Sequence, residues 1–186
     1  MAEESRYYQT LYEVARTINS SLDPTRVLEK ITSEVTRAMS AKAASIRLLD
    51  RKRLRLLLGA ACGLSRGYLR KGPVEVAKSG IDKEVIETGH PVATSSCTVN
   101  RLQYPEEAAR EGISSIMVVP LSVAGQVIGV LRVYDAECRE YAPHEVEFLQ
   151  AVADLSAIAI ENARLHEALK KDYELLAAYE SRLFED

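Results

Sequence analysis

The sequence is poor in cysteine and histidine, the residues that most often mark disulfide frameworks and metal sites. Its 186 residues contain three cysteines, Cys62, Cys97 and Cys138, which are odd in number and widely spaced. This pattern argues against a disulfide framework and suits a reducing compartment, so we expect a cytoplasmic protein. The three histidines have no cysteine or carboxylate at ligand spacing, so the sequence predicts no metal site.

Basic clusters and long apolar segments are also missing. The formal net charge is −3, and no run of lysine and arginine exceeds a few residues, which argues against a nucleic-acid partner. The longest apolar stretch, residues 116–130, contains Pro120, Ser122 and Gly125 and is too short for a membrane-spanning helix. The charged N-terminus is not followed by an apolar segment, so we expect a soluble protein with no signal peptide and no membrane partner.

The motifs of several common enzyme classes do not occur. No glycine-rich phosphate loop follows a strand, and no serine occupies a Gly-x-Ser-x-Gly turn. His144 and Glu145 lack the second histidine of a zinc-protease helix. We therefore expect a protein without enzymatic activity.

The most informative segment that is present is residues 112–135. It contains two apolar runs, residues 116–121 and 127–134, separated by Ala124 and Gly125. Two apolar runs joined by a short glycine-containing break predict two neighbouring strands and a tight turn.

The rest of the chain alternates between helical and strand patterns. Apolar residues at helical spacing predict a first helix over residues 5–21, and Asp23 with Pro24 gives the start signal of a second helix that runs to residue 39. Residues 63–78 are expected to be irregular. The remaining expected elements are strands at 44–49, 54–62 and 91–94, short helices at 81–88 and 105–111, and a long helix over 143–184. This order predicts an α+β fold: a mostly antiparallel central sheet of five to six strands, helices on both faces, and long terminal helices.

Several short strings, in this order, resemble the signature of GAF domains, the PAS-related small-molecule sensor modules of signalling proteins. The resemblance covers residues 8–168. The strings that carry it are Leu22-Asp23, residues 61–65, residues 89–92 (Gly-His-Pro-Val), residues 112–131 and residues 157–165. It implies a ligand pocket between one sheet face and the surrounding loops, and a regulatory role. We expect three parts: an N-terminal dimerisation helix (1–22), the GAF sensor domain (23–165) and a C-terminal coiled-coil signalling helix (166–186).

The terminal helix carries an apolar stripe at steps of three and four residues. The stripe consists of Leu155, Ile158, Asn162, Leu165, Leu169, Asp172, Leu176, Tyr179 and Leu183. Such a stripe predicts pairing with a second helix, although its first part, residues 155–165, would alternatively pack on its own sheet. We expect a homodimer in which the residues near the axis are Leu11, Ile18, Leu165, Leu169 and Leu176.

Two arginines interrupt otherwise apolar strands. By strand alternation, Arg47 points away from the face of Ile46, and Arg132 points away from the face of Leu131. The family's strand order would place these strands side by side, so both guanidinium groups would point into the pocket. Two buried cations favour an anionic small molecule such as a carboxylate, phosphate or nucleotide. The alternative is that they pair with Asp or Glu, or reach out to solvent.

Further ligand-binding residues follow from the resemblance to pocket-lining segments and from strand alternation: Thr94, Tyr104, Ser115 and Tyr134. The sequence leaves the ligand or cofactor unknown. The string typical of cyclic-nucleotide-binding GAF domains is missing, and Cys97 is followed by Thr98 rather than by the histidine common in bilin-binding members.

Two other functions remain open. One is a redox sensor, or an enzyme similar to free methionine sulfoxide reductases, that uses Cys62 and Cys97. The other is a dimerisation module without a ligand. For a sensor, the expected output partner is a histidine kinase of a two-component system, a nucleotide cyclase or phosphodiesterase, or a transcriptional regulator.

Overall fold

The computed structural model of the chain describes residues 2–20, 23–94 and 100–183, and the side chains of residues 4–20, 23–94 and 100–176. The helices are α1 (Ala2–Ser20), α2 (Pro24–Ala38), α3 (Arg66–Leu69), α4 (Gly80–Thr88), α5 (Pro105–Arg110) and α6 (Pro143–Leu183), with a 3₁₀ turn at Val76–Lys78. The strands are β1 (Ala43–Leu49), β2 (Arg55–Cys62), β3 (Val74–Glu75), β4 (Val92–Ala93), β5 (Ser115–Val123) and β6 (Gln126–Asp135).

The helix signals of the sequence act as predicted. Asp23 accepts hydrogen bonds from the backbone N–H groups of Thr25 and Arg26, and Pro24 is the first residue of α2. Gly89 ends α4 with a φ of 69°, a left-handed conformation that favours glycine.

The six strands form one antiparallel sheet in the order β3-β2-β1-β6-β5-β4. The predicted hairpin is β5–β6, and its two turn residues, Ala124 and Gly125, have φ values of 49° and 77°. β1 and β6 are neighbours at the centre of the sheet, where Ser45 pairs with Arg132. The α+β class, the strand number and the adjacency of β1 and β6 are therefore confirmed.

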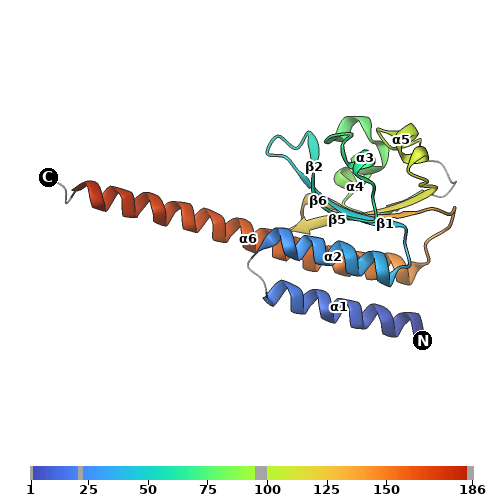
Figure 1. Cartoon of the computed structure of the whole chain (residues 1–186), viewed down its shortest axis with the longest axis horizontal. Helices are drawn as coiled ribbons and strands as arrows, with labels where there is room; N and C mark the ends of the chain where they lie inside the picture. The colour runs from blue at the N-terminus through green and yellow to red at the C-terminus, as the bar shows by residue number, and fades with distance from the viewer. Residues whose placement is uncertain (1, 21–22, 95–99, 184–186) are drawn as a thin grey trace.

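The sheet divides the molecule into two differently built halves (Figure 1). α2 and the first half of α6 cover one face, and α1 forms a further layer beneath them; α3, α4 and α5 cover the other face. The core between the sheet and the helices α2 and α6 includes Ile31, Ile46, Leu131, Val133, Leu149 and Val152. The core between the sheet and the helices α3, α4 and α5 includes Leu56, Tyr68, Ile81, Val118, Val130 and Tyr134.

The segment 63–78 is more regular than its sequence predicted. Ser65 accepts a hydrogen bond from the backbone N–H of Tyr68 and so caps the four-residue helix α3. β3 then adds two residues to the edge of β2. Elements of two to four residues are too short to show a periodic pattern in the sequence. Their structure depends instead on caps and on pairing with distant segments.

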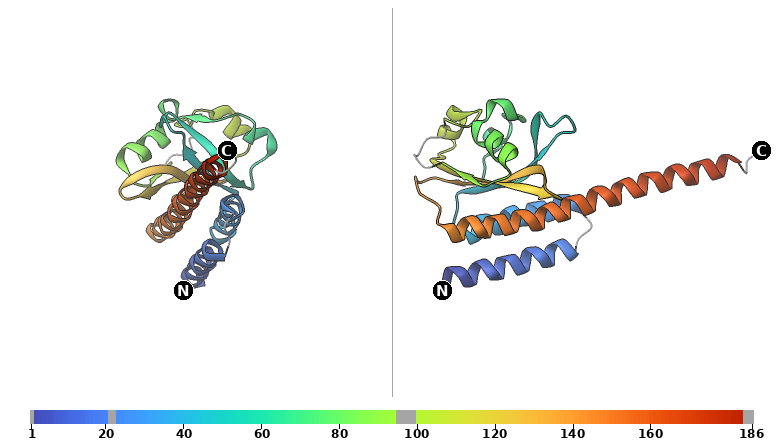
Figure 2. Two further views of the ribbon diagram at one scale, coloured as in Figure 1. Left: turned by 90° about the vertical axis from the view of Figure 1, so that its left-hand side faces the viewer. Right: turned by 180° about the vertical axis from the view of Figure 1, so that it is seen from behind.

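The two terminal helices differ in how they are held. α1 packs on the molecule through Val14, which is buried, and through Tyr7, whose ring stacks on Phe148 at 4.2 Å between centroids. α6 packs on the sheet with its first half and then projects well beyond it (Figure 2). Within the described ranges, no helix combines the length and the apolar character that a membrane span requires.

Candidate functional site

Arg47 and Arg132 are the two largest side chains that the sheet buries completely. Each is 1% exposed, and both lie among the residues of the face that α3, α4 and α5 cover, as the strand alternation predicted. Arg132 lies opposite Ser45, two residues before Arg47 along β1, and the ladder from β1 to β2 shifts its register between Ile46 and Arg47. Register shifts of this kind are common beside binding sites, because they redirect a side chain.

Arg132 has a carboxylate partner. Its Nε donates to Asp82 Oδ1 at 3.0 Å, and its Nη2 lies 2.5 Å from Asp82 Oδ2. Asp82 is itself fully buried in the first turn of α4 and also accepts a hydrogen bond from Ser79. Burial alone would lower the pKa of Arg132, but Asp82 and Tyr134 outweigh it, so the pKa of Arg132 is raised and the arginine stays charged. For Arg132, the alternative of pairing with an acidic residue is therefore confirmed.

Arg47 has no such partner. Its Nε and Nη2 are buried without a hydrogen-bond acceptor. Burial, followed by the neighbouring Arg132, lowers the pKa of Arg47; Tyr134 and Tyr68 oppose this shift, and none of these neighbours is a carboxylate. Arg47 is therefore a buried cation with unused donors.

Two tyrosines surround the guanidinium groups. Tyr134 shares a hydrogen bond of 2.9 Å with the hydroxyl of Ser45, and the ring of Tyr68 meets that of Tyr134 edge to face at 6.3 Å. The hydroxyl of Tyr68 is buried and has no hydrogen-bond partner. Burial, and secondarily Tyr134, raises the pKa of Tyr68, which therefore remains a neutral donor.

Lys71 forms the outer part of this cluster. Its Nζ lies 3.3 Å from the centroid of the Tyr68 ring and 5.3 Å from that of Tyr104, whose hydroxyl donates to Pro73 O at 3.4 Å. The ring contact favours the ammonium form. Burial, Arg132 and Arg47 nevertheless lower the pKa of Lys71 to about 7.

A cleft of about 320 Å³ opens beside this cluster. The residues that line the cleft are Ser65, Gly67, Tyr68, Glu107, Arg110 and Glu111. Tyr68 therefore lines the cleft and also contacts Tyr134 beside the buried arginines. We name Arg47, Tyr68, Lys71, Arg132 and Tyr134 the cationic cluster.

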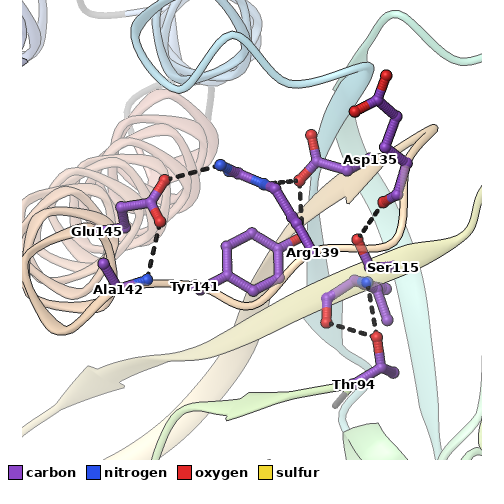
Figure 3. Close-up of polar contacts among 9 residues, drawn as sticks. Thr94, Ser115, Asp135, Arg139, Tyr141, Ala142 and Glu145 are labelled. Atoms are coloured by element: carbon purple, nitrogen blue, oxygen red, sulfur yellow. Dashed lines mark hydrogen bonds and ion pairs between the residues drawn. The ribbon is translucent and has the colours of Figure 1, made fainter. Parts of the chain in front are cut away.

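Two predicted site residues lie elsewhere and already have partners (Figure 3). Thr94 Oγ1 accepts from the backbone N–H of Ile116 at 3.0 Å and so joins the edge of β4 to β5. Ser115 Oγ donates to Glu137 O at 2.8 Å. Of the six residues predicted to bind ligand, the structure brings Arg47, Arg132 and Tyr134 together, and Tyr104 lies at the margin beside Lys71.

A polar network joins the end of β6 to the start of α6 (Figure 3). Arg139 donates to Asp135 from Nε and contacts Glu145 through Nη1, both at 3.0 Å, and Tyr141 donates to Asp135 at 2.8 Å. Glu145 also accepts from the backbone N–H of Ala142 at 2.8 Å. The network fixes the entry into α6 relative to the sheet.

The predicted helix stripe is exposed for most of its described length. Ile158 is 53% exposed, and Leu165, Leu169 and Leu176 are between 55% and 68% exposed. The alternative that residues 155–165 pack on their own sheet is wrong for Ile158 and Leu165, because Val152, Ala157 and Ile160 make that contact instead. Among the described side chains of the stripe, only Leu155 packs partly on the core. The side chains of Tyr179 and Leu183 lie outside the described residues.

The residues of the redox alternative are only partly described. Cys62 is a free, half-buried thiol at the end of β2, and Cys97 lies outside the described residues. Cys138 is disulfide-bonded, so the expectation that the cysteines are all unpaired is wrong for this residue. In the described part of the chain, no three His, Cys, Asp or Glu side chains are grouped so that they could hold a metal ion.

Sequence reasoning missed three members or supports of the cationic cluster: Asp82, Tyr68 and Lys71. Asp82 follows Ser79 by three residues, a spacing typical of helix starts, and this signal could have drawn attention to it. Tyr68 and Lys71 belong to the segment 63–78, which has no periodic pattern from which a direction could be read.

The sequence of the chain is similar to a known protein family and to parts of longer proteins. A GAF domain family model matches residues 21–161. The Nif-specific regulatory protein of Azospirillum brasilense is 26% identical over 170 residues, which cover 88% of this chain and 26% of that protein. The methyl sulfide methyltransferase-associated sensor of Methanosarcina acetivorans is 32% identical over 138 residues, which cover 68% of this chain and 13% of the sensor. The chain therefore spans only a small part of the length of these relatives.

Solved structures show the same fold. The GAF domain of a phosphoenolpyruvate-protein phosphotransferase from Coxiella burnetii has a TM-score of 0.77 at 20% identity and covers 88% of this chain and 98% of that domain. The free methionine-R-sulfoxide reductase of Neisseria meningitidis has a TM-score of 0.71 at 17% identity, over 86% of this chain and 91% of the reductase. With the family model spanning most of its length, the chain belongs to the GAF domain family and is homologous to parts of regulatory and sensor proteins.

Proposed function

We propose that the chain is a non-enzymatic sensor domain that binds a small anionic molecule at Arg47. The observation that carries this proposal is the complete burial of Arg47 with two donors, Nε and Nη2, that have no acceptor. The effective cost of burying an unpaired ion is several kcal/mol. A bound anion would offset that cost through charge-assisted hydrogen bonds, and the unused hydroxyl of Tyr68 would add another donor.

The test is native mass spectrometry of the whole chain purified from cells. We expect a retained small molecule on the wild type, its loss in Arg47→Met, and its retention in Arg55→Met, which changes a largely exposed arginine on β2. A molecule that survives Arg47→Met would contradict the site. The ligand-free dimerisation module would be favoured if the wild type retained no small molecule and if the side-chain NMR signal of Arg47 did not respond to added anions.

The proposed output is a homodimer formed through α6. Beyond residue 160, α6 carries exposed leucines and no described residue is buried by its own domain, so these side chains have no intramolecular cover. A second copy of the same stripe is the simplest complement, because a two-fold symmetric dimer pairs the same surface of both copies and heptad stripes pack against each other. Leu11 and Ile18 pack partly on the core of their own chain, so the α6 leucines are the main proposed contacts.

Sedimentation velocity at tens of micromolar tests this interface. We expect a dimer for the wild type, a monomer for the double variant Leu169→Glu/Leu176→Glu, and a dimer for Leu54→Glu, an exposed leucine outside α6. A monomeric wild type would contradict the proposal.

In this proposal, ligand binding shifts the helices α3 to α5 on their face of the sheet. β6 and Arg139 transmit this shift to α6 and change its orientation relative to the sheet. The relatives named as a regulatory protein and as a sensor are much longer than this chain. In the proposal, a kinase, cyclase, phosphodiesterase or transcriptional regulator would receive the signal. The redox alternative requires that Cys62 reacts. Thiol counting with and without peroxide tests it, and a peroxide-dependent loss of Cys62 reactivity would favour it over anion sensing.

A further inference from the structure

Lys71 is the cationic side chain that the proposed site does not yet use. Its ammonium group lies over the ring of Tyr68, whose hydroxyl is one of the unused donors of the cluster. Lys71 forms no ion pair with any described carboxylate. Lys71 therefore contacts Tyr68, which itself lines the cleft, and it lies close enough to Arg47 and Arg132 for their charges to lower its pKa.

The charged groups that act on Lys71 come from four elements. Arg47 on β1 and Arg132 on β6 disfavour its charged form, whereas Glu107 on α5 and Asp82 on α4 favour it. Asp82 already neutralises Arg132. The positive charges that remain without a close counter-charge are those of Arg47 and, when protonated, of Lys71.

We infer that Lys71 is a second anchor for the anion and that the ligand carries two negative charges, as a phosphate monoester or a dicarboxylate does. This inference rests on the proposed function at Arg47. One charge of the ligand would accept from Arg47, and the other would draw the Lys71 ammonium away from the face of Tyr68. A ligand with a single charge would pair with Arg47 and leave the protonated Lys71 without a counter-charge in a desolvated site, which is unfavourable.

The same arrangement links binding to protons. Because the pKa of Lys71 is about 7, roughly half of the unliganded molecules carry a neutral amine at neutral pH. A dianion beside this amine would raise its pKa, so binding takes up about half a proton per site at pH 7. The bound state then has two cations facing two negative charges.

A matched pair of ions tests the charge of the ligand. Sulfate and methanesulfonate both present a tetrahedral sulfur with at least three terminal oxygens but differ by one negative charge over the whole working pH range. We expect the Arg47 Nε–H signal in nitrogen-15 NMR spectra to shift with both ions, and sulfate to bind at least about tenfold more tightly than methanesulfonate. Titration calorimetry in two buffers of different ionisation enthalpy measures the proton uptake.

Variants separate this inference from the proposed function. In Lys71→Met, the preference for sulfate and the proton uptake disappear while methanesulfonate binding persists; Lys78→Met, which changes an exposed lysine paired with Glu75, leaves both unchanged. Equal binding of the two ions by the wild type, or a preference that survives Lys71→Met, overturns the inference but not the site at Arg47. No response of Arg47 to either ion overturns both. Phosphoserine and succinate, titrated next, distinguish the two sources of a dianion.

Discussion

The two faces of the central sheet are built from the same strands but differ in chemistry: one is apolar, and the other holds two buried arginines. Toward α2 and α6, β1 and β6 present apolar residues such as Ile46, Leu131 and Val133, all fully buried. Toward α3 to α5, the alternate positions of the same strands present Arg47 and Arg132. A face that holds an unpaired buried cation is not optimised for the stability of the unliganded fold. We infer that the face covered by α2 and α6 supplies most of the stability of the fold, and that the face covered by α3 to α5 supplies the binding specificity.

The first way to test this comparison is to break the ion pair on the binding face. Arg132→Met leaves the fully buried carboxylate of Asp82 without its cation, and we expect a loss of about 3–5 kcal/mol in the free energy of unfolding. Urea denaturation followed by circular dichroism measures it. The double variant Arg132→Met/Asp82→Leu should recover most of the loss, and a single variant as stable as the wild type would show that the pair is not buried.

A truncation on the opposite face of the same strand provides the reference. Leu131→Ala removes a completely buried side chain from the core under α2 and α6, and we expect a loss of about 2–5 kcal/mol because a cavity remains. The same urea experiment applies, and ion binding at Arg47 should be unchanged. If Leu131→Ala lost ion binding while remaining folded, the two faces would not be independent.

Arg47→Met is expected to change stability in the other direction. It replaces an unpaired buried cation with an apolar side chain of similar length, so we expect the unliganded protein to gain about 1–4 kcal/mol. The same substitution should abolish ion binding. A destabilised Arg47→Met variant would mean that the guanidinium has a structural acceptor, and would contradict the proposed site.

The last expected effect, and the smallest when expressed per pH unit, is a pH dependence that belongs to Lys71. The folded state holds the pKa of Lys71 near 7, below the ordinary value of 10.5, so between these values the unfolded chain binds more protons. Stability should therefore rise with pH from about 7 upward, by at most about 1.4 kcal/mol per pH unit, and the penalty should be fully present below pH 7. Chemical denaturation at pH 7.0 to 9.5 should show this slope in the wild type and lose it in Lys71→Met. Equal slopes would indicate a solvent-exposed amine.

Strand alternation was sufficient to predict that Arg47 and Arg132 share a face, because the side-chain direction in a strand follows a period of two. The sequence also predicted the hairpin at Gly125 and the start of α2 at Asp23, since both depend on contacts within a few residues. These features are local, and the physical rules that govern them are local as well.

The partners of the two arginines could not be predicted in the same way. Asp82 meets Arg132 across 50 positions of sequence, and this pairing depends on how α4 docks on the sheet. Lys71 and Tyr68 come from a segment held by the cap at Ser65, by two residues of strand pairing and by hydrogen bonds with distant residues such as Glu111. Strand alternation therefore located the two cations, and only the tertiary structure shows that one of them is neutralised.

The joint at Arg139 gives the long helix a mechanical property. Because Arg139 ties Asp135 at the end of β6 to Glu145 in the first turn of α6, the sheet and the helix start turn as one body. From its last buried residue, Ile160, α6 extends to residue 183, an arm of about 35 Å at 1.5 Å per residue. A tilt of about 5° of this arm about Ile160 would displace its tip sideways by about 3 Å. The length of α6 thus converts a small rotation of the sheet into a sideways displacement at the far end of the helix, which would rearrange any contact made there.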